Sequence, residues 1–150
     1  EAALLKGNNV VCLCEGDPFF YGSFMYIYAR LIDKYRIEVV PGVTSITTCA
    51  ARAGTPLAAR NERLTVLPGP LSAEELSVRI EGAESVAILK VGRHLEKIRV
   101  VIEGLGLSAQ ATYVERASLP DELVCPLIDA PKKAPYFSMI IITKGADPWL

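Results

Sequence analysis

Short apolar runs of strand length alternate with helical patterns along the first half of the chain. The predicted strands are residues 9–14, 36–40 and 63–67. The near-continuous apolarity of residues 9–14 is typical of a strand buried on both faces of a parallel sheet. Residues 20–31 place apolar side chains on one helix face, and Thr44 or Ser45 can cap a second helix that extends to about Arg52. The order strand, helix, strand, helix, strand predicts an α/β fold with a mostly parallel sheet.

The segment Pro68-Gly69-Pro70 is the strongest break in this pattern, because two prolines around a glycine disfavour both helix and interior strand. We interpret it as a linker between two lobes. Residues 1–68 are then the C-terminal part of a first α/β lobe, and residues 69–150 form a second α/β lobe.

The second half begins with a helix signature and ends in strands. Ser72 and Glu75 have the spacing of a capping box, which predicts a helix to about Gly82. A strand at 85–90 and a helix at 94–103 follow. The remaining strands are expected at residues 111–116, 123–127 and 137–143. Because no helix separates these last strands, they predict an antiparallel part and hence a mixed second sheet.

Composition excludes several classes of function. The formal net charge is -1 and no cationic stripe is present, so a nucleic-acid partner is not expected. No apolar stretch approaches the roughly 20 residues that span a bilayer, which predicts no membrane association, and no secretory signal is visible. The 4 cysteines lack metal-site spacing and there is 1 histidine, which predicts no metal site and buried thiols in a reducing cytoplasm.

Two strand-to-helix turns of the first half are candidate ligand loops, because ligands of open α/β sheets bind beyond the carboxyl ends of the strands. The first turn runs from Gly16 to Gly22, where Gly16 permits close backbone approach and Asp17 is an acceptor. The second runs from Pro41 to Ser45, where hydroxyls and helix N–H groups can bind a carboxylate or a ribose. A plain Asp-Pro turn and ordinary helix capping are the alternatives.

Two further candidate turns lie in the second half. The turn from Lys90 to His94 follows a strand, and its glycine would again bring backbone close to a ligand. Between Tyr113 and Glu122, Arg116 can pair with a carboxylate. Simple turns are the alternatives, with His94 as a helix cap or a surface residue. The sequence contains no nucleophile elbow, zinc-protease motif or reactive-cysteine context.

These four segments, in this order, resemble the tetrapyrrole methylases. Residues 16–22 resemble the family's G-D-P-x-x-Y-G loop, and residues 39–45 resemble its V-x-P-G-V-S-S segment. The further matches, to the subgroup that methylates C-20 of precorrin-2, are at residues 58–60, 64–68, 89–93, 113–117 and 136–141. A single G-D-P turn is a weak signal, but the ordered series extends along nearly the whole chain and is specific.

The resemblance implies a two-lobed tetrapyrrole methylase fold, with a mostly parallel first sheet, a mixed second sheet and S-adenosylmethionine bound in a cleft between the lobes. Backbone groups would make many of the contacts, which fits the small residues of the turns. The implied cofactor-binding residues are Gly16, Asp17, Pro18, Phe20, Thr44, Ser45, Val91, Gly92, Arg116, Ala117 and Ser138.

The implied reaction is methyl transfer from S-adenosylmethionine to C-20 of precorrin-2 or cobalt-precorrin-2 in cobalamin biosynthesis, with S-adenosylhomocysteine as the product. The conjugated tetrapyrrole supplies the nucleophilic carbon, so the protein mainly aligns it with the methyl group and excludes water. Asp17 and Tyr21 are, by position alone, the candidate catalytic residues for removing a proton. The resemblance further implies a homodimer and a cytoplasmic location.

The sequence departs from the family pattern at its start. Tetrapyrrole methylases begin with a strand and a G-x-G-P-G-D-P loop, neither of which precedes the first match in this sequence. We therefore expect an N-terminally truncated enzyme that holds part of the cleft. Two alternatives stay open, namely a methylase that acts at another precorrin position or on uroporphyrinogen III, and a non-catalytic ligand-binding fragment.

Overall fold

The computed structural model describes residues 1–145 of the 150-residue chain. Contacts divide the chain into two compact units, Glu1–Ser45 and Ile46–Leu150. The division falls at the start of a helix, α3 (Ser45–Ala53). Within residues 1–145, no helix has the length and apolarity needed to cross a membrane.

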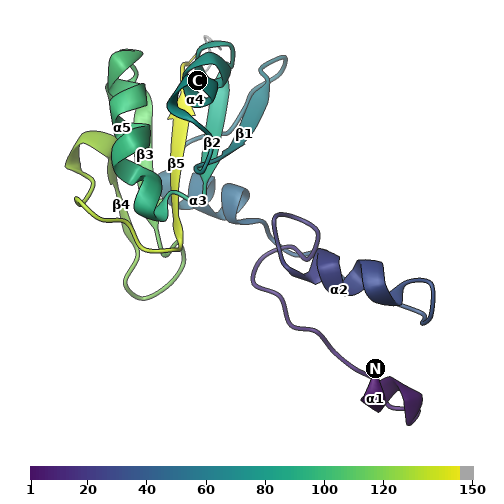
Figure 1. Cartoon of the computed structure of the whole chain (residues 1–150). Coiled ribbons are helices and arrows are strands. Elements are labelled where there is room, and N and C mark those ends of the chain that lie inside the picture. Colours follow the sequence, from purple (N-terminus) through teal and green to yellow (C-terminus); the bar gives the residue numbers. More distant parts are fainter. Residues whose placement is uncertain (146–150) are drawn as a thin grey trace. The chain divides into compact units, whose positions relative to one another are not determined.

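The first unit contains helices but no sheet (Figure 1). α1 (Ala2–Leu5) is a single turn, and α2 (Phe24–Leu31) confirms the predicted amphipathic helix from Phe24 onward. The segments 9–14 and 36–40 are not strands, so the strand predictions there are wrong, and the described residues do not form the expected first sheet. A run of apolar residues becomes a strand only through hydrogen bonds to a neighbouring strand, and this unit provides no such neighbour.

The second unit is built on a mixed sheet. Its strands are β1 (Leu64–Pro68), β2 (Ser85–Leu89), β3 (Ala111–Glu115), β4 (Leu123–Pro126) and β5 (Ser138–Thr143). The strand order is β1-β2-β5-β3-β4, with β1 parallel to β2 and all other neighbours antiparallel. The helices are α3, α4 (Ala73–Glu81) and α5 (Leu95–Gly104), with short 3-10 turns at Gly92–His94, Ser108–Gln110 and Leu127–Asp129. The predicted antiparallel strands are therefore confirmed.

The strand β1 belongs to this sheet, although its position before the proline-rich break predicted that it lies in a first lobe. The segment Pro68-Gly69-Pro70 is a turn inside the second unit and not a linker between the units. The Gly69 N–H donates to the Leu89 carbonyl at 2.7 Å, and a Cβ at Gly69 would lie 2.7 Å from the Lys90 carbonyl oxygen. Glycine is needed there because two backbones touch. The lobe boundary at residues 68 and 69 stays a prediction.

The hydrophobic core lies between the sheet and the helices α4 and α5, which cover one of its faces (Figure 1). α4 begins with the predicted capping box, in which Ser72 and Glu75 each accept a backbone N–H of the other at 3.2 Å. The buried side chains of this face include Leu76, Ile80, Ile98, Ile102, Val86, Ile88, Tyr113, Ile140 and Ile142. Ala87, Val114, Met139 and Ile141, which alternate with them in β2, β3 and β5, are also buried, so these strands are covered on both faces.

One edge of the sheet collects several strand ends. Because β5 is antiparallel to both β2 and β3, the strands β1, β2 and β3 all run in the same direction. Their carboxyl ends therefore lie beside the amino end of β5, and we call this edge the carboxyl-end edge. Two of the predicted ligand turns, at residues 90–94 and 116–122, leave the sheet there.

The cysteines differ in burial between the units. Cys49 is buried and Cys125 is partly buried, whereas Cys12 and Cys14 are exposed. The prediction of buried thiols is therefore wrong for Cys12 and Cys14, because the strand that would have buried them is not formed.

Candidate functional site

The two predicted ligand turns of the first unit meet through the Asp17 carboxylate. Its Oδ1 accepts the Phe19 N–H and its Oδ2 accepts the Gly42 N–H, both at 2.9 Å. A Cβ at Gly42 would lie 2.8 Å from the Gly16 carbonyl carbon, so glycine is required where the two backbones touch. Gly16 has φ +78°, a conformation that favours glycine. The structure thus brings the turns at 16–18 and 41–45 together, as two loops joined at their backbones.

The contacts of Asp17 favour a positioning role over that of a base. Its two hydrogen bonds, first that from Gly42 and then that from Phe19, lower the pKa of the carboxyl below its ordinary value. A carboxylate that already accepts two N–H groups is a weaker proton acceptor at neutral pH. The catalytic role of Asp17 stays a prediction.

The other predicted residues of the first unit lie around these turns. Tyr21 has φ +54° and is 44% exposed, and its ring meets the Phe20 ring edge-on at 5.1 Å between centroids. A positive φ in a bulky residue is strained and is typical of functional turns. Pro18 is partly buried. Thr44 is partly buried next to Ser45, the first residue of α3, which confirms the helix predicted to begin there.

Strained residues also mark the carboxyl-end edge of the second unit. Lys90 after β2 has φ +55°, while Arg116 and Ser118 after β3 have φ +49° and +66°. Gly92 has φ +32°. Of the five described non-glycine residues with positive φ, four lie in predicted ligand turns: these three and Tyr21. Such clustering is typical of sites where backbone conformation serves ligand binding.

Ser138 joins the two turns of the carboxyl-end edge. It is buried, and its Oγ accepts the Gly92 N–H at 3.3 Å and donates to the Pro135 carbonyl at 2.7 Å. Ser138 pairs with Glu115 in the ladder of β5 and β3, and the Arg116 N–H donates to the Phe137 carbonyl at 2.9 Å. The structure therefore assembles the predicted residues of this unit, Val91, Gly92, Arg116, Ala117 and Ser138, at one edge of the sheet.

The Arg116 guanidinium is engaged with carboxylates of its own chain. Its Nη1 lies 3.2 Å from Glu115 Oε1 and 3.1 Å from Asp121 Oδ2. The buried Glu115 also accepts the Tyr113 hydroxyl at 2.6 Å, and burial followed by this contact raises the pKa of Tyr113. The suggestion that Arg116 pairs with a substrate carboxylate is therefore not supported, because two carboxylates already share it. Its backbone is engaged as well, because the Arg116 N–H donates to the Phe137 carbonyl and the Arg116 carbonyl accepts the Leu119 N–H, both at 2.9 Å.

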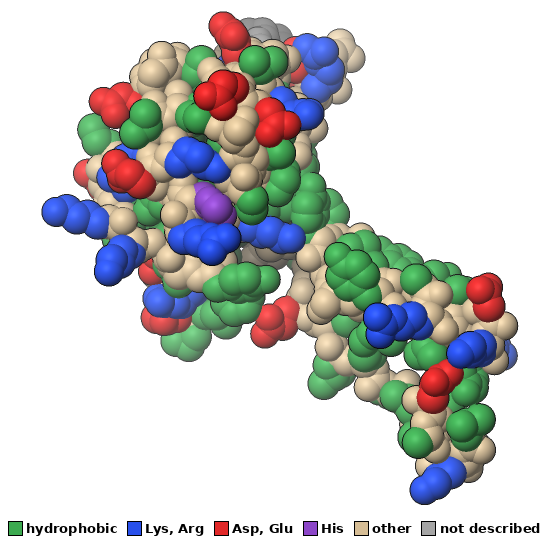
Figure 2. Space-filling model, viewed as in Figure 1, with side chains coloured by type: hydrophobic (Ala, Val, Ile, Leu, Met, Phe, Trp, Pro, Cys, Tyr) green, Lys and Arg blue, Asp and Glu red, His purple; other side chains and the backbone are tan. Residues whose placement is uncertain are grey.

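His94 is the helix N-cap position of α5, in keeping with the alternative of a cap or surface residue, and its side chain makes no cap hydrogen bond. Figure 2 shows it between cationic side chains. Burial, Lys97 and Arg93 lower the pKa of His94, so its neutral form dominates at pH 7. Arg93 Nε lies 3.4 Å from His94 Nε2. No geometry here assigns His94 a catalytic partner among the described residues.

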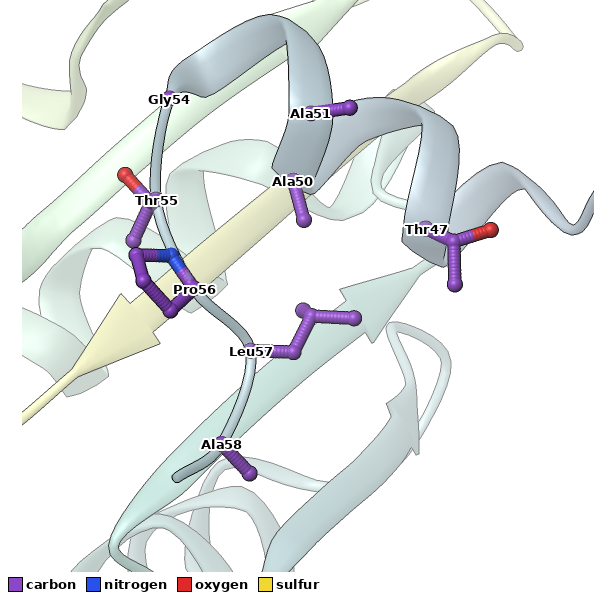
Figure 3. Close-up of a pocket in the computed structure, with 8 residues that line it drawn as sticks. All are labelled: Thr47, Ala50, Ala51, Gly54, Thr55, Pro56, Leu57 and Ala58. Carbon is purple, nitrogen blue, oxygen red and sulfur yellow. The ribbon is translucent and has the colours of Figure 1, made fainter. Parts of the chain in front are cut away.

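A pocket of about 410 Å³ lies between α3 and the segment that follows it (Figure 3). In Figure 3 the Leu57 side chain points toward α3, where Ala50 and Thr47 lie. The lining consists of small, aliphatic and hydroxyl side chains and includes none of the predicted site residues. We therefore take two separate sets of candidate residues, the joined turns at 16–18 and 41–45 in the first unit and the carboxyl-end edge in the second unit. Within residues 1–145 no cluster of metal-ligating side chains occurs.

Sequence reasoning missed three residues that hold the candidate site. Tyr113, Glu115 and Glu122 were noted only as parts of a strand and turn. Glu115 and Glu122 accept hydrogen bonds from Arg116 and Ser118 of the turn, and the Tyr113 hydroxyl donates to Glu115. The signal was present for Glu115, since a carboxylate in an otherwise apolar strand has to find partners when it is buried. For Glu122 no local pattern indicates its partner, because that partner, Arg52, is 70 residues away in the sequence.

Comparison with known proteins gives a consistent set of relatives. A precorrin-2 C(20)-methyltransferase from Sinorhizobium sp is 41% identical over 147 residues, which is 97% of this chain and 60% of that protein. This chain thus spans only part of the relative's length. Residues 1–128 match the family described as Tetrapyrrole (Corrin/Porphyrin) Methylases.

Solved structures agree with this result. A cobalt precorrin-4 methyltransferase has a TM-score of 0.75 and 26% identity, over 98% of this chain and 69% of its own. A uroporphyrin-III C-methyltransferase from Thermus thermophilus, complexed with S-adenyl homocysteine, has a TM-score of 0.59 and 24% identity, over 84% of this chain and 62% of its own. With the match of residues 1–128, they confirm the predicted resemblance: the chain belongs to the tetrapyrrole (corrin/porphyrin) methylase family.

Proposed function

We propose that this chain is the cofactor-binding part of an S-adenosylmethionine-dependent methyltransferase that acts at C-20 of precorrin-2 or cobalt-precorrin-2 in cobalamin biosynthesis. The observation that carries the proposal is the 41% identity to the Sinorhizobium precorrin-2 C(20)-methyltransferase over 97% of the chain. That coverage extends over all four predicted ligand turns. The activity belongs to the protein as a whole, because the chain spans 60% of that relative.

The backbone at the candidate site supports S-adenosylmethionine as the cofactor. At Gly92 a Cβ would find only the Pro135 carbonyl, at 3.9 Å, so a flat ligand can approach the backbone there. The related Thermus enzyme was solved with S-adenyl homocysteine, the demethylated form of this cofactor. The proposed binding residues are Gly16, Asp17, Pro18, Phe20, Thr44, Ser45, Val91, Gly92, Arg116, Ala117 and Ser138.

The residues of the chain would act mainly by binding and orienting. S-adenosylmethionine supplies an activated methyl group, and the tetrapyrrole supplies the electron pair that forms the new carbon–carbon bond. Asp17 holds the two loops of the first unit together, and Ser138 fixes the Gly92 amide. Tyr21, which is 44% exposed, is the better candidate for moving a proton, because two backbone hydrogen bonds lower the pKa of Asp17 and make its carboxylate a weaker base. This arrangement needs alignment and no protein nucleophile.

The proposal extends to the finer properties that the family resemblance implies. A tetrapyrrole is the substrate, the parent protein is a homodimer in the cytoplasm, and its lobes divide at residues 68 and 69. Membership of the tetrapyrrole methylase family supports the substrate class.

Calorimetry with S-adenosylhomocysteine tests the proposal directly. The chain should bind one equivalent, and Asp17→Ala should weaken the affinity by at least about tenfold, because it removes two charge-assisted hydrogen bonds. A folded sample that binds neither S-adenosylmethionine nor S-adenosylhomocysteine would contradict the assignment for this chain. Turnover of uroporphyrinogen III in preference to precorrin-2 would replace the proposed substrate with that of another methylase.

A further inference from the structure

We propose that Arg52 and Glu122 form a positioning pair that holds the turn at residues 116–118 in the conformation that binds the cofactor. This inference rests on the proposed function, because it concerns how the same site is kept in shape. Neither residue is one of the proposed binding residues. Both lie within the second unit, which contains the whole of the turn.

The Glu122 carboxylate makes two kinds of contact at once. Arg52 Nε lies 2.8 Å from both carboxylate oxygens, and its Nη2 lies 2.7 Å from Oε1. The Ser118 N–H also donates to Oε2, in a short hydrogen bond. The Glu122 side chain is 15% exposed although that of Arg52 is 52% exposed. The carboxylate is thus fixed by a guanidinium on one side and presents an acceptor to the turn on the other.

The turn needs such a contact because its backbone is strained. Arg116 and Ser118 have φ +49° and +66°, which non-glycine residues rarely adopt, and Ala117 lies between them. Without an acceptor for the Ser118 N–H, the turn can relax toward ordinary conformations. The backbone groups of Arg116 and Ala117 would then move away from the positions that a bound cofactor requires.

The pair also ties the turn to a helix that is itself fixed. Arg52 lies in the last turn of α3, and the buried residues of that helix are Ile46, Cys49 and Ala50. Arg52 and then the Ser118 amide lower the pKa of Glu122, so its carboxylate is ionised at neutral pH. The ionised Glu122 carboxylate therefore connects the turn, through the Ser118 amide, to Arg52 on the packed helix α3.

The second unit contains a matched pair that provides a control. Glu84 also accepts an arginine side chain and a backbone N–H: Arg63 Nη2 lies 2.7 Å from Oε1, Arg63 Nε lies 3.0 Å from Oε2, and the Arg63 N–H lies 3.2 Å from Oε2. This pair lies next to Leu64 and Ser85, where β1 and β2 begin, at the edge opposite the carboxyl-end edge. Its loss should cost stability without touching the proposed site.

The experiment compares Glu122→Ala with Glu84→Ala in the whole chain. We measure the affinity for S-adenosylhomocysteine, the denaturation midpoint, and the exchange rate of the Ser118 amide. Glu122→Ala should weaken the affinity by about tenfold and speed exchange of the Ser118 amide, because a charge-assisted acceptor is lost. Glu84→Ala should lower the midpoint comparably and leave the affinity within about twofold.

A charge swap separates positioning from a simple structural link. The double variant Arg52→Glu with Glu122→Arg restores an ion pair between α3 and the turn, but an arginine cannot accept the Ser118 N–H. The swap should therefore recover the midpoint and not the affinity. Full recovery of the affinity, or an equal loss of affinity in Glu84→Ala, would overturn the proposal.

Failure of the proposed function would look different. If the wild-type chain binds no S-adenosylhomocysteine, the proposed function fails for this chain. The exchange rate of the Ser118 amide then still tests whether Glu122 positions the turn. Unchanged exchange of that amide in Glu122→Ala overturns the positioning role, and faster exchange supports it.

Discussion

In the unit Glu1–Ser45 none of the residues is buried, whereas in the unit that starts at Ile46 the strands β2 and β5 are buried along nearly their whole length. Both units contain apolar runs of strand length. Residues 9–14 expose Val10, Val11 and Leu13 by 57%, 81% and 93%, but Ile140, Ile141 and Ile142 of β5 are each 0% exposed. Composition is therefore not what separates them.

The difference lies in what each run has beside it. β5 lies between β2 and β3, so both of its backbone edges are hydrogen-bonded. The segment 9–14 pairs with no strand in the part of the chain that the structure describes. In the first unit, the contacts of Asp17 instead join two turns. Long-range pairing creates a strand, and a turn can form without one. The candidate residues of the first unit lie on turns, and those of the second unit lie where paired strands end or begin.

Amide exchange should show the largest contrast between the units. Amides at residues 9–14 lack ladder bonds and should exchange nearly as in an unfolded peptide, whereas those of Ile140 and Ile141 should exchange at least about a thousandfold more slowly. Exchange followed by mass spectrometry or NMR measures both in one sample. Strong protection at residues 9–14 would show that the segment has a partner in solution and would remove the contrast.

A matched pair of leucine truncations should show the next largest effect. Leu76 of α4 is 0% exposed and Leu13 is 93% exposed. Leu76→Ala should cost about 2–5 kcal/mol in the free energy of unfolding because it leaves a cavity in the core. Leu13→Ala should change it by less than about 0.5 kcal/mol. Denaturant titration measures both values. A large loss on Leu13→Ala would mean that the apolar run of the first unit is buried in solution.

The sequence was informative for the second unit because local signals and tertiary partners agree there. The Ser72 and Glu75 capping box, the helix that follows and the three antiparallel strands are all present. The predictions from the sequence were wrong where the pairing of strands had to be inferred. Residues 9–14 and 36–40 have strand composition but no pairing partner among residues 1–145. The pairing of β1 with β2 across the Pro68-Gly69-Pro70 turn was not expected, because proline and glycine were interpreted as a linker. Strand pairing depends on contacts that periodicity does not contain.

The candidate site was located through turns and a family resemblance, while its internal contacts required the structure. The sequence marked Gly16, Asp17 and Gly92 as ligand turns, and the structure gives each a defined backbone role. The sequence also suggested that Arg116 pairs with a carboxylate of the substrate. In the structure the Arg116 guanidinium already pairs with Glu115 and Asp121. Side-chain partners far apart in sequence, such as Arg52 and Glu122, leave no local pattern.

Substituting Gly42 would test whether the first unit depends on its turns. Gly42→Ala places a Cβ 2.8 Å from the Gly16 carbonyl carbon and should separate the two loops, weakening S-adenosylhomocysteine binding by at least about tenfold. The denaturation midpoint of the second unit should hardly change. Gly104→Ala at the end of α5 is the control, because a Cβ there meets nothing within 4 Å. Calorimetry compares the variants, and wild-type affinity in Gly42→Ala would show that the loops need not touch.

The smallest predicted difference concerns acid stability and the ion pairs of the two units. The Arg63 side chain holds the pKa of Glu84 at about 2, below the ordinary 4.5. A lowered pKa stabilises the fold above pH 4.5, and this contribution is lost as the pH falls toward 2. The difference in denaturation midpoint between wild type and Glu84→Gln should therefore be constant at neutral pH and vanish near pH 2.

In the first unit Glu1 makes a single 3.1 Å contact with Lys34, so Glu1→Gln should show a weaker trend of the same sign. Equal pH profiles for the two variants would mean that the bidentate geometry of the second unit adds nothing to an exposed single contact.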